Sequence, residues 1–157
     1  MRRICLILLV TALTAPAASL AGDRAVGDGS LVVTNASGTI IVQGRGLIFG
    51  HIDQGTLVVL DFRPEDPSGV LTVTGAIGKL VRSGATSTGT DVRFLLPSGR
   101  YKIQLVGTGI DVSAVGRGWV SATGTGTSDD GSFTVNGGKP QQLAKGSAGQ
   151  PFGGKSS

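Results

Sequence analysis

Glycine punctuates this sequence at short intervals, and short runs of β-branched and aromatic residues stand between the glycines. It accounts for 27 of the 157 residues, without the every-third-residue period of collagen. Runs such as SLVVTN, TIIVQG, TLVVLDF and YKIQLVG are rich in Val, Ile and Thr, and turn-forming residues bound them. No window places apolar residues at helical spacing between capping residues. The pattern predicts an all-β fold.

Alternation within the runs indicates which side chains face a core. Tyr101, Ile103 and Leu105 should point inward, while Lys102 and Gln104 point to water. Between two other runs stands the segment DQGT at 53–56, where glycine could supply the positive φ of a tight hairpin. A hairpin there predicts antiparallel neighbours.

One glycine pattern occurs twice in the chain. GRGLIFGHIDQGTL (44–57) and GTGIDVSAVGRGWV (107–120) carry glycine at the same three places. We interpret this as an internal duplication of about 38–75 and 101–137, with chance matching of Gly-rich segments as the alternative. The expected architecture is an antiparallel β-sandwich of two related five-stranded halves, and a short β-solenoid is the second choice.

The duplication predicts specific equivalences between the two halves. Gly46 should be equivalent to Gly109, and Gly55 to Gly118. Because side-chain direction alternates along a strand, Phe49 and Val112 should both face the core. Leu57 and Val120 should form a second such core pair.

The N-terminus reads as an export signal. Arg2 and Arg3 precede a short apolar run, and small residues follow up to Ala21, where we expect cleavage. An uncleaved anchor is the alternative. We therefore predict a secreted or cell-envelope location, with no stable membrane insertion after cleavage. The expected organisation is a signal peptide at 1–21, a polar lead-in at 22–28, one all-β domain at 29–138 and a disordered tail at 139–157.

Charge and cysteine content narrow the class of partner. The net charge of +4 falls to +2 when Arg2 and Arg3 leave with the signal, and the remaining basic residues are scattered singly. This small excess gives no reason to expect a nucleic-acid partner. The sole cysteine, Cys5, lies within the signal, so the exported chain should depend on its hydrophobic core without a disulfide.

Catalytic and cofactor motifs are missing from the sequence. The sole histidine, His51, lies two residues from Asp53, and zinc would need three or four such ligands. The pair could act as an acid and base on one strand face, but a surface histidine is the default. There is no Gly-x-Ser-x-Gly elbow, and the Gly-rich segments lead into strands, so they are not phosphate-binding loops. We predict no cofactor and no enzymatic activity.

Two loops are acidic, at 61–69 and 124–131. Calcium takes carboxylate and loop-carbonyl oxygens, and the two loops fall at matching places in the repeat, where both clusters should be exposed. The alternative is that Asp, Pro, Ser and Gly simply form turns. The calcium candidates are Asp61, Glu65, Asp66, Asp129 and Asp130.

The sole tryptophan, Trp119, lies near Arg117. An exposed Trp beside an Arg could anchor a protein partner. A core or edge aromatic is the alternative.

Two long stretches resemble a group of small exported actinobacterial β proteins of unknown function. They are GSLVVTNASGTIIVQGRGLIFGHIDQGTL and GTDVRFLLPSGRYKIQLVGTGIDVSAVGRGWV. The sequence pattern of short strands separated by glycines is also loosely similar to that of adhesin-type and bactofilin-type β-solenoids. Neither resemblance implies catalytic residues.

These features together favour an exported, non-catalytic, adhesin-like interaction module, acting as an envelope component or on a protein partner. The alternative is a periplasmic or extracellular binder of a small apolar or lipidic ligand, held between the two halves. An apolar cavity of about 300 Å³ or more would favour that binder. A hydrolase with an unfamiliar site is a third hypothesis.

Overall fold

The computed structural model describes residues 27–65, 71–75, 84–146 and 149–154. No helix occurs in these ranges, and every strand pair is antiparallel, which confirms the all-β, antiparallel prediction. The predicted signal peptide lies outside them. The strands are β1 (Gly29–Pro64), β2 (Thr72–Thr74), β3 (Thr86–Leu96), β4 (Gly99–Gly124), β5 (Ser132–Val135), β6 (Gln141–Gln142) and β7 (Gln150–Phe152).

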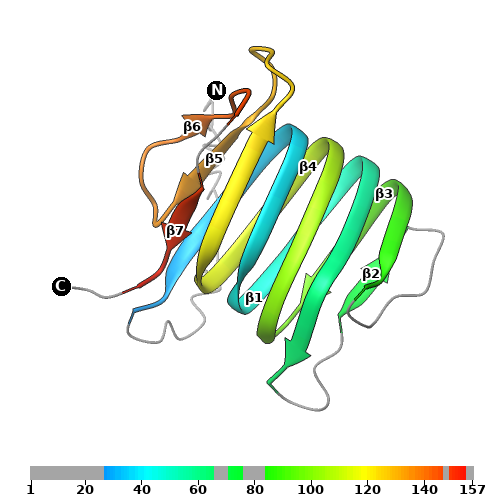
Figure 1. The fold of residues 1–157 in the computed structure, drawn as a ribbon, viewed down its shortest axis with the longest axis vertical. Helices are drawn as coiled ribbons and strands as arrows, with labels where there is room; N and C mark the ends of the chain where they lie inside the picture. Colours follow the sequence, from blue (N-terminus) through cyan, green and yellow to red (C-terminus); the bar gives the residue numbers. More distant parts are fainter. Residues whose placement is uncertain (1–26, 66–70, 76–83, 147–148, 155–157) are drawn as a thin grey trace, which may run out of the picture.

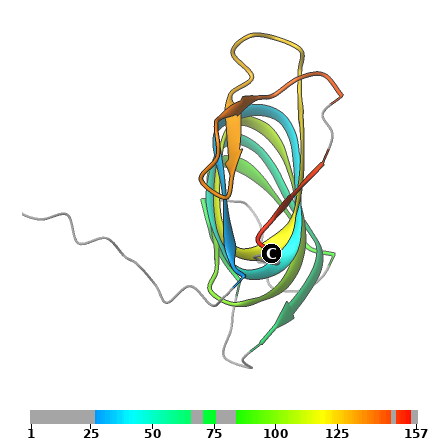
Figure 2. The same cartoon turned by 90° about the vertical axis from the view of Figure 1, so that its left-hand side faces the viewer.

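Two long strands, β1 and β4, wind together into a flattened coil (Figure 1). Gly29 and Gly46, at successive places along β1, both pair with Gly116 of β4. Likewise Gly107 and Gly124 of β4 both pair with Gly38. One turn of β1 therefore runs from Gly29 to Gly46, and the part of β1 from Gly38 to Arg45 lies between two antiparallel turns of β4. Viewed from the end, the turns superpose as a flattened ring with two long sides (Figure 2).

Rows of glycine form the two narrow edges of this coil. At Gly46, φ is +128°, and an added Cβ would collide with the carbonyl oxygen of Val115. At Gly107, a Cβ would collide with the carbonyl oxygen of Gln54. Glycine is needed because neighbouring backbones approach too closely for any side chain. One edge row contains Gly124, Gly38, Gly107, Gly55 and Gly89, and the other contains Gly29, Gly116 and Gly46.

Inward-facing apolar side chains fill the space between the two long sides. Tyr101, Ile103 and Leu105 are at most 4% exposed, as their alternation predicts. The two layers face each other as in a sandwich, but the strands bend continuously from one layer into the other. Burial of these rows supplies the hydrophobic stabilisation that a chain without disulfides requires.

The predicted hairpin at 53–56 is wrong. Strand β1 continues through this segment, where Gly55 pairs with both Gly107 and Gly89. Because Gly55 belongs to an edge row, it bends the strand from one layer to the other without reversing it. The runs 47–53 and 56–62 consequently pair with β3 and β4 and not with each other.

The predicted equivalences hold for one core pair and fail for the other. Leu57 and Val120 are both buried, as predicted. By contrast Phe49 is 44% exposed whereas Val112 is 1% exposed. The predicted glycine equivalences are wrong as well: Gly46 and Gly55 belong to edge rows, whereas Gly109, which packs against Asp53, and Gly118, which pairs with Gly44, do not. The alignment is therefore out of register at Phe49 and Val112. A shift of one residue reverses side-chain direction. An ancestral duplication stays a prediction.

The predicted boundary at residue 138 is also wrong, because the segment that follows is structured. Strands β6 and β7 lie within it, and β7 pairs with β4 through Gln150 and Val120. Leu143 is 4% exposed and Phe152 is fully buried. The low apolar content predicted disorder, yet both of these side chains belong to the hydrophobic core.

The edge glycines generate a test of the coil. Gly46→Ala should lower the free energy of unfolding by about 3 kcal/mol, since it adds a backbone clash to an unfavourable φ. The matched control is Gly154→Ala, at φ +132° with nothing within 4 Å of its Cβ. Urea unfolding followed by circular dichroism measures both. Equal losses in the two variants would contradict close packing at the edge.

Candidate functional site: a cationic groove

Four arginines stand in one row across successive strands of the coil. Arg45 of β1 lies between Arg117 and Arg100 of β4, and Arg100 also pairs with Arg63 at the end of β1. All four side chains are exposed, and the row runs beside one glycine edge. Like charges directly opposite one another destabilise a sheet. The row is therefore not explained by folding.

A second outward row runs parallel to the arginines, two residues after them in β4 and two residues before them in β1. It contains Trp119, Gln43 and Lys102, with Asp61 opposite Lys102. Between the two rows, a hollow of about 510 Å³ opens on the surface. We call this hollow the cationic groove. Its lining residues are Gln43, Gly44, Arg45, Asp61, Arg100, Tyr101, Lys102, Arg117, Gly118 and Trp119.

The floor of the groove is formed by an inward row with two glycines. Gly118 and Gly44 pair with each other, and Tyr101 pairs with Gly44, so all three line the groove between the two outward rows. Tyr101 is 4% exposed, and its hydroxyl has no hydrogen-bond partner among the described residues. Burial raises the pKa of Tyr101 above its usual range, so the hydroxyl keeps its proton. A buried donor without a partner is costly.

Carboxylates neutralise part of the row. Arg45 forms an ion pair with Glu65, and Ser98 donates a hydrogen bond of 2.8 Å to the same carboxylate. These contacts, Ser98 first, lower the pKa of Glu65, which therefore stays ionised. Arg117 lies 3.5 Å from Asp28.

Two cationic side chains in the groove have no acidic partner among the described residues. Within the part of the chain that the structure describes, neither Arg100 nor Lys102 makes an ion pair. Asp61 lies 3.8 Å from Arg63. The groove therefore has an excess of positive charge.

The predicted partner anchor belongs to this groove. Trp119 is 46% exposed, and Arg117 lines the groove with it. One side of the indole is covered by the end of the chain, since Gly149 packs against it and Pro151 pairs with Trp119.

Three residues of the groove were not predicted from the sequence, namely Arg45, Arg100 and Lys102. One turn of the coil separates Arg100 from Arg117, and one turn likewise separates Arg45 from Arg63. This recurring interval between arginines was the signal that could have found the row.

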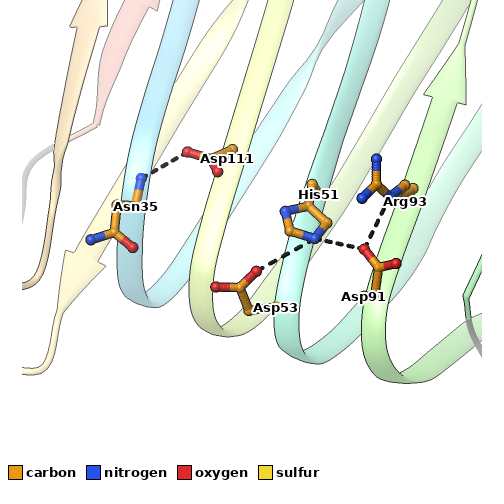
Figure 3. A network of polar contacts seen from close by, with 6 residues as sticks. All are labelled: Asn35, His51, Asp53, Asp91, Arg93 and Asp111. Carbon is orange, nitrogen blue, oxygen red and sulfur yellow. Dashed lines mark hydrogen bonds and ion pairs between the residues drawn. The ribbon is translucent and has the colours of Figure 1, made fainter.

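Strand register places His51 on the long side of the coil opposite the groove, and Figure 3 shows its polar neighbours. Its Nε2 is 3.4 Å from Asp53, the predicted partner, and 2.9 Å from Asp91 of β3. Arg93 donates to Asp91 at 3.0 Å, and this contact, together with the hydrogen bond from His51, lowers the pKa of Asp91. Asp111 is opposite His51 in β4 and accepts from the backbone N–H of Asn35.

These polar residues form an open cluster on the sheet surface. Asp91 and Arg93 were missed by sequence reasoning because only strand register brings them to His51. The cluster is a half-buried surface histidine in polar contact with Asp53 and Asp91.

The two acidic loops differ from each other. Asp61 and Glu65 pair with arginines beside the groove, and Asp66 lies outside the described residues. Asp129 is exposed, but Asp130 is 1% exposed, so the prediction that both clusters are exposed is wrong for Asp130. No group of three or more metal-ligating side chains occurs in the described parts.

Asp130 instead organises its own loop. Its carboxylate accepts hydrogen bonds from the hydroxyls of Thr125 and Thr127, at 2.5 and 2.7 Å. It also accepts from the backbone N–H groups of Gly126 and Thr127. These hydrogen bonds hold the pKa of Asp130 far below its usual range, and the bond from Thr125 has the largest effect.

Comparison with known proteins found no matching family model, no matching curated protein and no matching solved structure. The resemblance to exported actinobacterial β proteins and to β-solenoids stays a prediction. The described residues include no helix with the length and apolar character needed to cross a membrane.

Asp130 predicts a pH dependence of stability. The pKa of Asp130 is lower in the folded than in the unfolded chain. Its contribution to the free energy of unfolding is therefore complete above the pKa of the unfolded chain, about 4, and is lost as pH falls below it. Asp130→Asn should lower the urea midpoint at pH 7, and its difference from the parent should shrink below about pH 4. Asp129→Asn is the control and should match the parent throughout. A constant difference for Asp130→Asn would contradict the assignment.

Proposed function

We propose that this protein is an exported, non-catalytic interaction module that binds an anionic polymer of the cell envelope in the cationic groove. Export is supported by the N-terminal signal pattern in the sequence. The observation that carries the proposal is the row of Arg117, Arg45, Arg100 and Arg63 on adjacent strands.

Strand spacing makes this row a binding surface for repeated charges. Adjacent strands lie about 4.8 Å apart, so neighbouring arginines repel each other. An anion bound between two of them relieves this repulsion and is itself held by both. Guanidinium groups hold phosphate and carboxylate with paired hydrogen bonds. A polymer with an anionic group on each repeat unit would satisfy several arginines at once. Arg100 and Lys102, which lack acidic partners in the described chain, are the first contacts that we assign.

The groove also offers contacts for the neutral part of such a polymer. Trp119 forms one end, and an exposed indole can pack against sugar rings or alkyl carbons. Gln43, which pairs with both Trp119 and Lys102, adds an uncharged hydrogen-bonding side chain beside the indole.

The alternative of an apolar or lipidic ligand between the layers gains no support from the structure. The described interior is filled by apolar side chains such as Ile40, Ile48 and Leu57, all fully buried. Among the described residues, half of those lining the hollow of about 510 Å³ are charged, as are four of the five lining a second hollow of about 330 Å³. We therefore propose the anionic polymer alone.

Binding can be measured through Trp119, the only tryptophan of the chain. Sodium polyphosphate and poly-γ-glutamate are the phosphate and carboxylate probes, with neutral dextran as the uncharged control. Both anionic probes should change the fluorescence of Trp119, and the affinity should fall as salt screens the charges. Arg100→Gln combined with Lys102→Gln should weaken binding at least about tenfold, which corresponds to about 1.4 kcal/mol.

The matched control is Arg93→Gln on the opposite long side, which should bind like the parent. Preference for one probe over the other identifies the anionic group. Equal binding by the parent and the Arg100→Gln/Lys102→Gln variant would overturn the assignment of the groove.

A further inference from the structure

Ten outward-facing residues form an uncharged array on the long side of the coil that also carries the second row of the groove. They lie in two rows of five strand segments, each row continuous through the pairing of β4, β1 and β3. We call this array the hydroxyl–methyl face. Its first row is Thr123, Thr39, Val106, Thr56 and Thr88, and its second is Ser121, Ile41, Gln104, Val58 and Thr86.

The side chains of this face are stiff. Eight of the ten are Thr, Val or Ile, whose branched Cβ restricts χ1. Thr56 and Thr88 are further fixed by a hydrogen bond of 2.9 Å between their hydroxyls. An array of this kind loses little conformational entropy when it binds a rigid surface.

The face is regular in two dimensions. Neighbouring strands place its side chains about 4.8 Å apart, and alternate residues along a strand are about 6.8 Å apart. Residues such as Ala122 and Leu57, which separate the two rows, are fully buried and hold the strands in register. Methyl and hydroxyl groups therefore recur on a lattice whose spacings are close to those of water oxygens in ice.

The other long side shows that the fold does not require this composition. There the outward positions include Asp111, His51 and Arg93 in one row, and the large apolar Phe49 and Leu95 in the next. Charged residues are thus accepted on an outward face of the same coil. Their exclusion from all ten positions is a property of the hydroxyl–methyl face.

We propose that the hydroxyl–methyl face binds the surface of ice. Methyl groups at this spacing leave the adjacent waters free to bond with one another, while threonine hydroxyls fix some of them in place. The ordered waters then continue the lattice of an adjoining crystal. Charged side chains would bind water in other orientations, which explains their exclusion. This inference rests on a different surface from the cationic groove and does not depend on polymer binding.

Partition into ice tests the proposal. The exported protein is placed in a solution from which ice grows slowly on a cold finger, and its enrichment in ice over liquid is measured. Shaping of single ice crystals is recorded in parallel. The parent should be enriched several-fold relative to a non-binding protein of similar size and should facet the crystals.

Val106→Lys is the informative variant, because Val106 is 40% exposed at the centre of the first row and its side chain has no hydrogen bond to lose. It should lose the enrichment and the faceting. The matched control is Val32→Lys, the same substitution at a residue 43% exposed on the opposite long side, which should keep both. Thermal unfolding followed by circular dichroism checks that both variants are folded, and Thr39→Lys replaces Val106→Lys if the latter is not.

Three outcomes would overturn the proposal. The parent could show no more enrichment than the reference protein. The Val106→Lys and Val32→Lys variants could be enriched equally. Sedimentation could also show a parent dimer that Val106→Lys dissociates, without any ice enrichment, which would assign this face to self-association.

Discussion

The close approach of backbones at the glycine edges is the constraint on which this structure depends. Where Gly46 faces Gly116, and where Gly38 faces Gly107 and Gly124, no Cβ separates the neighbouring strands. The strands can therefore bend sharply at every half turn without losing their antiparallel pairing. This repeated bend converts two long strands into a closed pair of layers around one apolar interior.

The same bends determine which residues share a surface. Each turn brings a strand back beside its own starting point, with one turn of the other strand between them. Two residues of one strand that are one turn apart in sequence therefore lie in the same row, on either side of a residue from the other strand. Arg100 and Arg117 flank Arg45 for this reason, and Thr39 lies between Thr123 and Val106. One side of the coil thus carries a charged groove and an uncharged array close together. The cationic groove and the hydroxyl–methyl face use different positions along the same strands, within one coil.

Local patterns predicted the parts of this structure that local physics controls. The all-β class and the inward direction of Tyr101, Ile103 and Leu105 follow from residue type and alternation. The bend at Gly55 could not be distinguished from a hairpin, because glycine serves both and only the distant partners Gly107 and Gly89 decide between them. The groove was missed because strand register is a long-range property, and arginines scattered singly in sequence gave no local signal.

Backbone contacts of Gly116 test the coil most directly. In a nuclear Overhauser spectrum of the isotope-labelled protein, Gly116 should show cross-strand contacts to both Gly29 and Gly46, which lie one full turn apart in the same strand. A sandwich built from hairpins would give Gly116 no such pair of partners. Contacts linking 47–53 with 56–62, without contact between Gly116 and Gly29, would contradict the coil.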